Sequence, residues 1–170
     1  MPELQRLRFD HAPALLRFER ENRAFFAASI PDRGDDYFTH FDARHQELMA
    51  EQAAGLHFFH VLVDGEGEVL GRVNLVGVEG SSAELGYRIA ERATGRGLAT
   101  AAVREACALA AREYGLTTLR AATTVDNAAS RAVLARTGFV ADGEPGDDFT
   151  LSGGRPALRF VRVLAREAER

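Results

Sequence analysis

The sequence predicts an α/β (α+β) domain with a mixed, mostly antiparallel central sheet. Hydrophobic residues recur at helical spacing near the N-terminus, at a spacing of two through the middle, and in alternating helical and strand segments afterwards. Glycine-rich turns separate the segments that have the spacing of two, as in antiparallel hairpins. No repeat or linker interrupts this order, so residues 1–170 are expected to form one domain.

The first third of the chain is expected to form a short strand and then two helices. Apolar and polar residues alternate over residues 4–9, which is the spacing of a strand. Apolar residues within 13–28 then follow the spacing of an amphipathic helix. Residues 31–34 (PDRG) interrupt it, and a second helix is expected over about 36–54, where Gly55 ends it.

Three strands joined by two turns are expected next. They cover His57–Val63, Val69–Val78 and Ala83–Ile89, and the turns lie at 64–67 and 79–82. Because short turns join antiparallel neighbours, this part of the chain predicts an antiparallel sheet.

Helices and strands alternate in the last part of the chain. A stripe of small apolar residues predicts a helix from Leu98 to about Tyr114, ended by Gly115. The remaining expected elements are a strand at Thr117–Val125, a short helix between Asp126 and Gly138, a strand at Phe139–Ala141, an irregular Gly- and Asp-rich segment, and a final strand from about Leu158 to Leu164.

Composition and charge argue against several classes of protein. The formal net charge is -4 and no block of basic residues occurs, which argues against binding to nucleic acid. No segment resembles a signal peptide and no apolar run is long enough to span a bilayer, so a soluble cytoplasmic protein without a membrane partner is expected. The single cysteine, Cys107, lies on an apolar helical stripe and is expected to be a small core residue.

The loop before the Leu98 helix carries the strongest functional signal. Its sequence is R-x-x-G-x-G over Arg92–Gly97. Gly95 and Gly97 allow a sharp turn and let a ligand approach the main-chain N–H groups. Unpaired N–H groups at the start of a helix attract anions, so the loop predicts a site for a phosphate or a pyrophosphate.

Three kinds of phosphate site could use such a loop. A nucleotide P-loop requires a lysine and then Ser or Thr after its second glycine, where Leu98 and Ala99 stand, so this alternative fails. A dinucleotide site would need a third small residue at Thr100 and an acid about twenty residues later, and Asp126 comes too late. Dinucleotide binding is therefore the weaker alternative.

Motifs on both sides of the loop support the third kind of site. Ala83–Ile89 (AELGYRI) before the loop, the N-x-x-S of Asn127–Ser130, and Thr137–Phe139 (TGF) together resemble the acetyl-CoA site of the GNAT N-acetyltransferase superfamily. Phe18–Arg23 (FERENR) and Gly86–Tyr87 resemble its ribosomal-protein N-terminal (alanine) acetyltransferase branch. The resemblance covers essentially the whole chain.

This resemblance implies a GNAT-like sheet with helices on both faces and a splayed central pair of strands, with acetyl-CoA bound at the gap. Strand 83–89 is implied to carry a bulge, where the N–H of Arg88 or Ile89 would polarise the thioester carbonyl. The residues implied to bind the cofactor are Tyr87, Arg88, Ile89, Arg92, Gly95, Arg96, Gly97, Leu98, Ala99, Thr100, Asn127 and Ser130.

The resemblance also implies transfer of an acetyl group to a primary amine without a metal ion or an acyl-enzyme. Glu84 is the candidate general base, although an acid at the start of a strand can equally be a solvated surface residue. His57 and His60 are weaker candidates. Ser130 is the candidate proton donor to the thiolate, because Leu134 stands where many relatives have a tyrosine; its alternative role is a local main-chain hydrogen bond.

A protein or peptide N-terminal α-amine is the expected acceptor, with a small-molecule amine as the alternative. A homodimer is compatible with the family. Relatives often carry an acid before the last strand, and Leu151–Ala157 lacks one. A non-catalytic sensor or interaction module that binds acyl-CoA is therefore the alternative to an enzyme.

Overall fold

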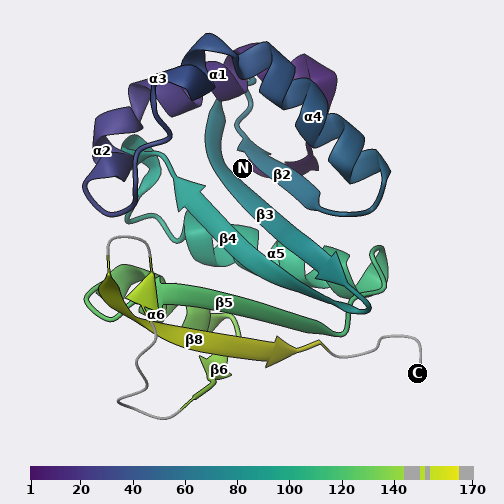
Figure 1. The fold of residues 1–170 in the computed structure, drawn as a ribbon, viewed down its shortest axis with the longest axis vertical. Helices are drawn as coiled ribbons and strands as arrows, with labels where there is room; N and C mark the ends of the chain where they lie inside the picture. The colour runs from purple at the N-terminus through teal and green to yellow at the C-terminus, as the bar shows by residue number, and fades with distance from the viewer. Residues whose placement is uncertain (144–149, 152–153, 165–170) are drawn as a thin grey trace.

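The computed structural model describes residues 1–143, 150–151 and 154–164, and its strands form an eight-stranded sheet (Figure 1). The order across the sheet is β1-β2-β3-β4-β5-β8-β6, and β7 pairs with β8 outside this path. The strands are β1 (Glu3–Arg6), β2 (Phe58–Val63), β3 (Val69–Glu79), β4 (Ser82–Ile89), β5 (Thr118–Thr124), β6 (Val140–Ala141), β7 (Thr150–Leu151) and β8 (Arg155–Val163).

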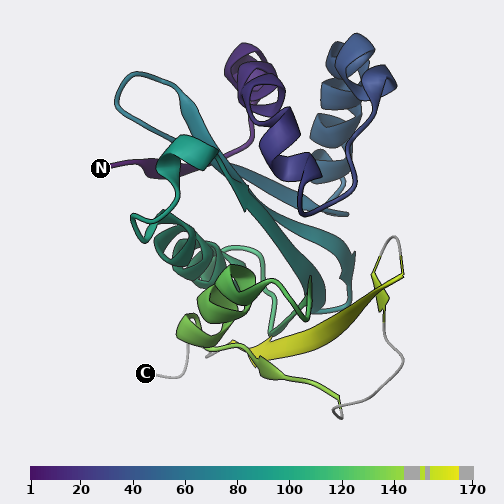
Figure 2. The ribbon, with the colours of Figure 1, turned by 90° about the vertical axis from the view of Figure 1, so that its left-hand side faces the viewer.

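Helices cover both faces of this sheet (Figure 2). One face carries α1 (Ala12–Glu21), α2 (Arg23–Ala27), α3 (Asp35–Thr39) and α4 (Phe41–Ala53), and the other carries α5 (Leu98–Arg112) and α6 (Ala128–Arg136). Two short 3-10 helices, η1 (Phe9–His11) and η2 (Glu91–Ala93), follow β1 and β4. Among the residues described, no helix is long and apolar enough to cross a lipid bilayer.

The expected mixed, mostly antiparallel fold is confirmed. Neighbouring strands are antiparallel throughout the path except for β4 and β5, which are parallel. Helix α5 packs its small side chains against the sheet, and the residues of this stripe, Ala102, Val103, Ala106, Cys107 and Ala110, are buried. The small size of these side chains lets the helix lie close to the strands, which positions the loop before it at the edge of β4.

The two front helices are each shorter than the sequence predicts. The helix expected over 13–28 ends at Glu21 and begins again at Arg23, because Asn22 leaves the helical conformation. The Asn22 side chain donates to Phe18 O and accepts from the N–H of Glu91, both at 2.9 Å. The helix expected over 36–54 breaks in the same way at His40.

The end of the chain also differs from the expectation. Strand β8 begins at Arg155 rather than near Leu158, and it pairs with the short β7, which the sequence did not predict. In the sheet, β8 lies between β5 and β6. Part of the Gly- and Asp-rich segment lies outside the described residues.

Strands β4 and β5 separate along their length. Only Ser82, Ala83 and Glu84 of β4 pair with β5. Beyond Glu84 the strands diverge, as Figure 1 shows, so the expected splayed pair is confirmed. The expected bulge near Arg88 is not present: the register of β4 with β3 is continuous up to Ile89, and its irregularity lies at the other end, between Val76 and Glu79 of β3.

Candidate active site

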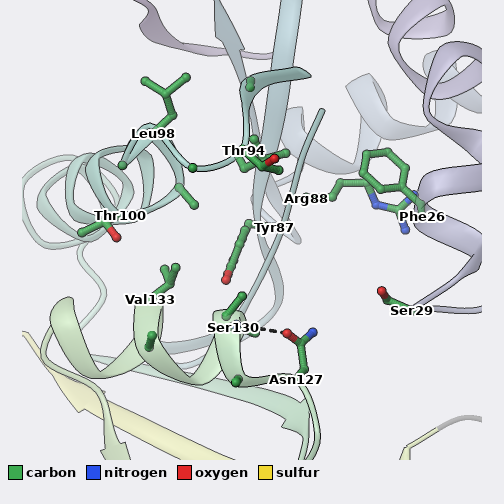
Figure 3. Close-up of a pocket in the computed structure, with 18 of the residues that line it drawn as sticks. Phe26, Ser29, Tyr87, Arg88, Thr94, Leu98, Thr100, Asn127, Ser130 and Val133 are labelled. Atoms are coloured by element: carbon green, nitrogen blue, oxygen red, sulfur yellow. Dashed lines mark hydrogen bonds between the residues drawn. The ribbon is translucent and has the colours of Figure 1, made fainter. Parts of the chain in front are cut away.

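A cavity of about 750 Å³ lies where the end of β4, the loop before α5, and α6 meet (Figure 3). The end of α2 and the residues after it close its remaining side. The cavity is lined by Phe25, Phe26, Ser29, Ile30, Tyr87, Arg88, Ile89, Ala93, Thr94, Gly95, Gly97, Leu98, Ala99, Thr100, Asn127, Ala128, Ala129, Ser130, Ala132, Val133 and Arg136.

The loop before α5 presents bare main chain to this cavity. Gly95 and Gly97 have φ angles of 77° and 75°, in the left-handed region that favours glycine. A Cβ atom built on either glycine would meet no atom within 4 Å, so open space lies beside both. The first helical bond runs from the N–H of Ala101 to Gly97 O at 3.1 Å, which leaves the N–H groups of residues 98–100 without helical partners. Such an arrangement suits a diphosphate.

Ten of the twelve residues expected to bind the cofactor line this cavity. The exceptions are Arg92 and Arg96, which lie in the loop with exposed side chains. A guanidinium outside the wall can add to the positive potential near the loop, but it does not shape the cavity. Main-chain N–H groups therefore dominate the chemistry of the loop.

A second, narrower cavity of about 170 Å³ occupies the gap between β4 and β5. It is lined by Leu85, Gly86 and Tyr87 of β4 and by residues 121–124 of β5. Tyr87 and Ser130 line both cavities, so the gap adjoins the larger cavity at α6.

The direction of the main-chain N–H groups decides which of them face the gap. The N–H of Ala90 donates to Leu70 O at 2.8 Å, which marks this opposite pair as a hydrogen-bonded one. Hydrogen-bonded and non-bonded pairs alternate along antiparallel strands, so the N–H of Arg88 faces β3. The N–H groups of Tyr87 and Ile89 face the gap instead. Of the two N–H groups expected to polarise the thioester carbonyl, those of Arg88 and Ile89, only that of Ile89 faces the gap. The N–H of Tyr87, which was not expected as a donor, faces the gap as well.

The start of α6 brings a hydroxyl to the junction of the two cavities. Asn127 caps the helix, because its Oδ1 accepts the N–H of Ser130 at 3.1 Å. The phenol of Tyr87 points toward Ser130 in Figure 3. Burial raises the pKa of Tyr87, and the contact with Ser130 offsets only part of that rise, so the phenol is protonated at neutral pH. Leu134 is buried at 1% exposure and brings no hydroxyl here.

The structure does not bring the expected general base, or either of the two weaker histidine candidates, into a cavity. Glu84 is exposed at the point where β4 and β5 separate. His57 accepts the N–H of Gly77 at 2.9 Å. His60 is buried and contacts the Tyr114 hydroxyl at 2.6 Å, and burial lowers its pKa to about 4. Both histidines therefore have local structural partners.

A buried charged group behind the wall of the cavity was missed by the sequence analysis. We call it the Glu19 cluster: Glu19, Arg33, Arg72 and Arg88. Glu19 Oε1 accepts from Arg72 at 3.0 Å, and its Oε2 accepts from Arg33 at 2.9 Å and from Arg88 at 3.2 Å. The sequence did contain an indication of this group. Glu19 lies four residues after the buried Leu15 on α1, so both side chains lie on the same, buried face of the helix.

Arg88 therefore has two roles in the site. Its main chain belongs to β4, and its side chain joins the Glu19 cluster and packs over the Phe26 ring at 4.8 Å. Burial, together with repulsion from Arg33, lowers the pKa of Arg88 to about 10, so the guanidinium remains charged at neutral pH. From the sequence, only the main chain of Arg88 was expected to contribute to the site.

Comparison with known proteins agrees with this arrangement. A family model described as an acetyltransferase (GNAT) domain matches residues 3–140. A protein of Bacillus subtilis strain 168, named as a candidate ribosomal N-acetyltransferase, YdaF, is 33% identical over 106 residues. That match covers 61% of this chain and 58% of the length of the relative.

Solved structures share the fold over nearly the whole chain. A ribosomal-protein-S5-alanine acetyltransferase from Vibrio fischeri has a TM-score of 0.88 at 22% identity, covering 96% of this chain and 93% of the other. RimJ from Mycobacterium smegmatis, in complex with CoA-disulfide, has a TM-score of 0.81 at 27% identity, covering 94% and 80%. A spermidine N-acetyltransferase from Vibrio cholerae, in complex with CoA and spermine, has a TM-score of 0.77 at 18% identity, covering 96% and 95%. The family model, the separated strands and the glycine loop lead to one conclusion: the chain belongs to the GNAT acetyltransferase family.

Proposed function

We propose that this protein is an acetyl-CoA-dependent N-acetyltransferase whose acceptor is the α-amine of a protein or peptide N-terminus. The cofactor assignment depends on the loop before α5, where open space lies beside Gly95 and Gly97 and the N–H groups of residues 98–100 lack helical partners. A diphosphate fits this loop because it accepts several N–H donors at once. The CoA-disulfide in the RimJ structure, at 27% identity, supports the same ligand class.

The residues present fit the rest of acetyl-CoA as well. The diphosphate would be held by the loop, and the pantetheine arm by the free edge of β4, where the N–H groups of Tyr87 and Ile89 face the gap. When bound, acetyl-CoA supplies an acetyl group that its thioester activates. One of these two N–H groups would hold the carbonyl oxygen of that group as negative charge develops, and the other would be left for the pantetheine arm. Ser130 would give a proton to the departing sulfur, with the Tyr87 phenol beside it as a second hydroxyl.

The charges on the walls favour an α-amine over a polyamine. No Asp or Glu lines either cavity within the described part of the chain. A polyamine carries several positive charges and would need carboxylates to bind it. An α-amine has a pKa of about 7.7–8.0, so a useful fraction of it is already neutral near pH 7.5. The observation that carries the acceptor assignment is this absence of carboxylates.

Thiol release from acetyl-CoA, with mass spectrometry of the products, tests the proposed function. A panel of peptides with free N-termini, the same peptides with blocked N-termini, and spermidine would serve as acceptors. We expect acetylation of the free N-termini and none of the blocked peptides. Acetylation of spermidine alone would contradict the acceptor assignment.

A non-catalytic acyl-CoA sensor is the second candidate function. It is favoured by Leu134, which replaces the tyrosine of many relatives, and by the position of Glu84 outside both cavities. The same assay distinguishes the two functions. Binding of acetyl-CoA without thiol release, with every acceptor of the panel, would identify a sensor.

Glu84→Gln tests the proposed general base. Residues 84, 86 and 88 share one face of β4, because side chains alternate along a strand. A water molecule could therefore carry a proton from an amine near Gly86 to Glu84. We expect kcat to fall about a hundredfold. Glu66→Gln, in the turn between β2 and β3, is the matched control. Unchanged kcat in both variants would exclude Glu84 as the base.

A further inference from the structure

The Glu19 cluster brings an excess of positive charge to the side of the cavity that α2 lines. Three guanidinium groups surround one carboxylate, and the side chains of Glu19 and Arg72 are only 1% and 4% exposed. One carboxylate balances one of the three positive charges. The remaining charge is only partly screened, because Arg72 is buried while Arg33 and Arg88 are partly exposed.

Neighbouring acids remove only part of this excess. Asp32 and Asp35, which lie nearest along the chain to Arg33, both bind Arg23, each at 2.8 Å, so one of their two negative charges is balanced there and one positive charge of the cluster is still in excess. Arg33 itself packs over the Tyr37 ring at 4.6 Å. Among the described residues of the two cavity walls there is no carboxylate that could pair with Arg88.

Arg88 is the member of the cluster that reaches the cavity. Its Nη1 donates to Glu19, and its side chain is 19% exposed. Figure 3 shows Arg88 with Phe26 on the wall opposite Leu98 and Thr100, with Tyr87 between the two sides. The glycine loop, which would hold the diphosphate, and Arg88 therefore lie on opposite sides of Tyr87, beside which the thioester would lie.

We propose that Arg88 binds a carboxylate carried by the acceptor close to its amine, so that the preferred acceptors are peptides with Asp or Glu at the second or third residue. This inference rests on the proposed function and narrows its substrate class. A guanidinium and a carboxylate match in geometry, and their hydrogen bonds are strengthened where water is partly excluded. The same charge would repel a lysine side chain or a polyamine at this place.

Three matched peptides test the proposal: Ser-Asp-Asp, Ser-Asn-Asn and Ser-Lys-Lys, each followed by the same neutral tail. We expect kcat/KM about tenfold higher for the Asp peptide than for the Asn peptide, and lowest for the Lys peptide. In Arg88→Gln the ratio between the Asp and Asn peptides should fall to about one, and Arg88→Lys should retain part of it. High salt should reduce the ratio in the unmodified protein.

Arg33→Gln is the control, because Arg33 also binds Glu19 but lines neither cavity. It should weaken the fold as Arg88→Gln does while leaving most of the Asp-to-Asn ratio in place, because Arg88 itself is kept. A ratio near one in the unmodified protein, or an unchanged ratio in Arg88→Gln, would overturn the proposal. If no peptide is acetylated, the proposed function fails. Binding of the three peptides to the CoA-loaded protein then still decides whether Arg88 selects an acidic acceptor: equal binding, or no binding, contradicts it.

Discussion

Replacing Gly97 with valine is expected to weaken acetyl-CoA binding at least a hundredfold. The φ angle of Gly97 is 75°, a conformation that a β-branched residue rarely adopts. The side chain would also enter the open space beside the N–H groups of residues 98–100. Losing two charge-assisted hydrogen bonds to a phosphate is worth about 3–6 kcal/mol, which exceeds a hundredfold in affinity. Calorimetric titration with acetyl-CoA measures the change.

Gly67→Val is the matched control for this substitution. Gly67 has a φ angle of 80°, it lies in the turn before β3, and an added Cβ atom would likewise meet nothing within 4 Å. Both variants carry the same backbone strain, but only Gly97 lines the cavity. Equal acetyl-CoA affinity in the two variants would show that the loop does not hold the diphosphate.

Replacing Glu19 with glutamine is expected to lower the free energy of unfolding by about 3–5 kcal/mol, because it leaves buried guanidinium groups without a balancing charge. Glu19 is 1% exposed and binds Arg33, Arg72 and Arg88. Urea denaturation followed by circular dichroism measures the effect. In the control Asp35→Asn, a 90% exposed carboxylate loses the same kind of partner, and the change should be much smaller. Equal losses in the two variants would contradict the account of the cluster.

The stability that Glu19 contributes should also depend on pH. Burial alone would raise the pKa of Glu19, but the three arginines, Arg72 and Arg33 foremost, outweigh burial and hold it below its ordinary value of 4.5. As the pH falls below that value, the unfolded chain takes up a proton before the folded protein does. The contribution is therefore complete above pH 4.5 and is lost as the pH falls through the lower folded pKa. The difference between Glu19→Gln and the unmodified protein should shrink over the same range.

The fold follows from the sequence wherever local spacing decides the structure. The alternation within Ala83–Ile89 and the apolar stripe of α5 correspond to β4 and α5 in the structure. Hydrogen bonds between distant residues are not visible in such spacing. The break at Asn22 comes with a bond to Glu91, 69 residues later in the chain. The position of β8 between β5 and β6 also depends on pairing between distant strands, which local spacing does not reveal.

The glycine loop was predictable because few residues tolerate the backbone that it needs. Gly95 and Gly97 both adopt left-handed φ angles, and the presence of glycine at both positions indicates this conformation. The residue type does not indicate in which direction a main-chain N–H points. Only the register with β3 shows that Ile89, and not Arg88, faces the gap. The Arg88 side chain was undervalued for a similar reason, since its partner Glu19 lies on another element.

A crystal structure of the protein with bound acetyl-CoA would show whether the glycine loop holds the diphosphate. We expect the diphosphate within hydrogen-bonding distance of the N–H groups of residues 98–100, and the thioester beside Tyr87 between the separated β4 and β5. A diphosphate bound elsewhere, for example in the arginine-lined groove of Arg104, Arg136 and Arg162, would contradict this expectation. So would a complex in which β4 and β5 pair along their whole length.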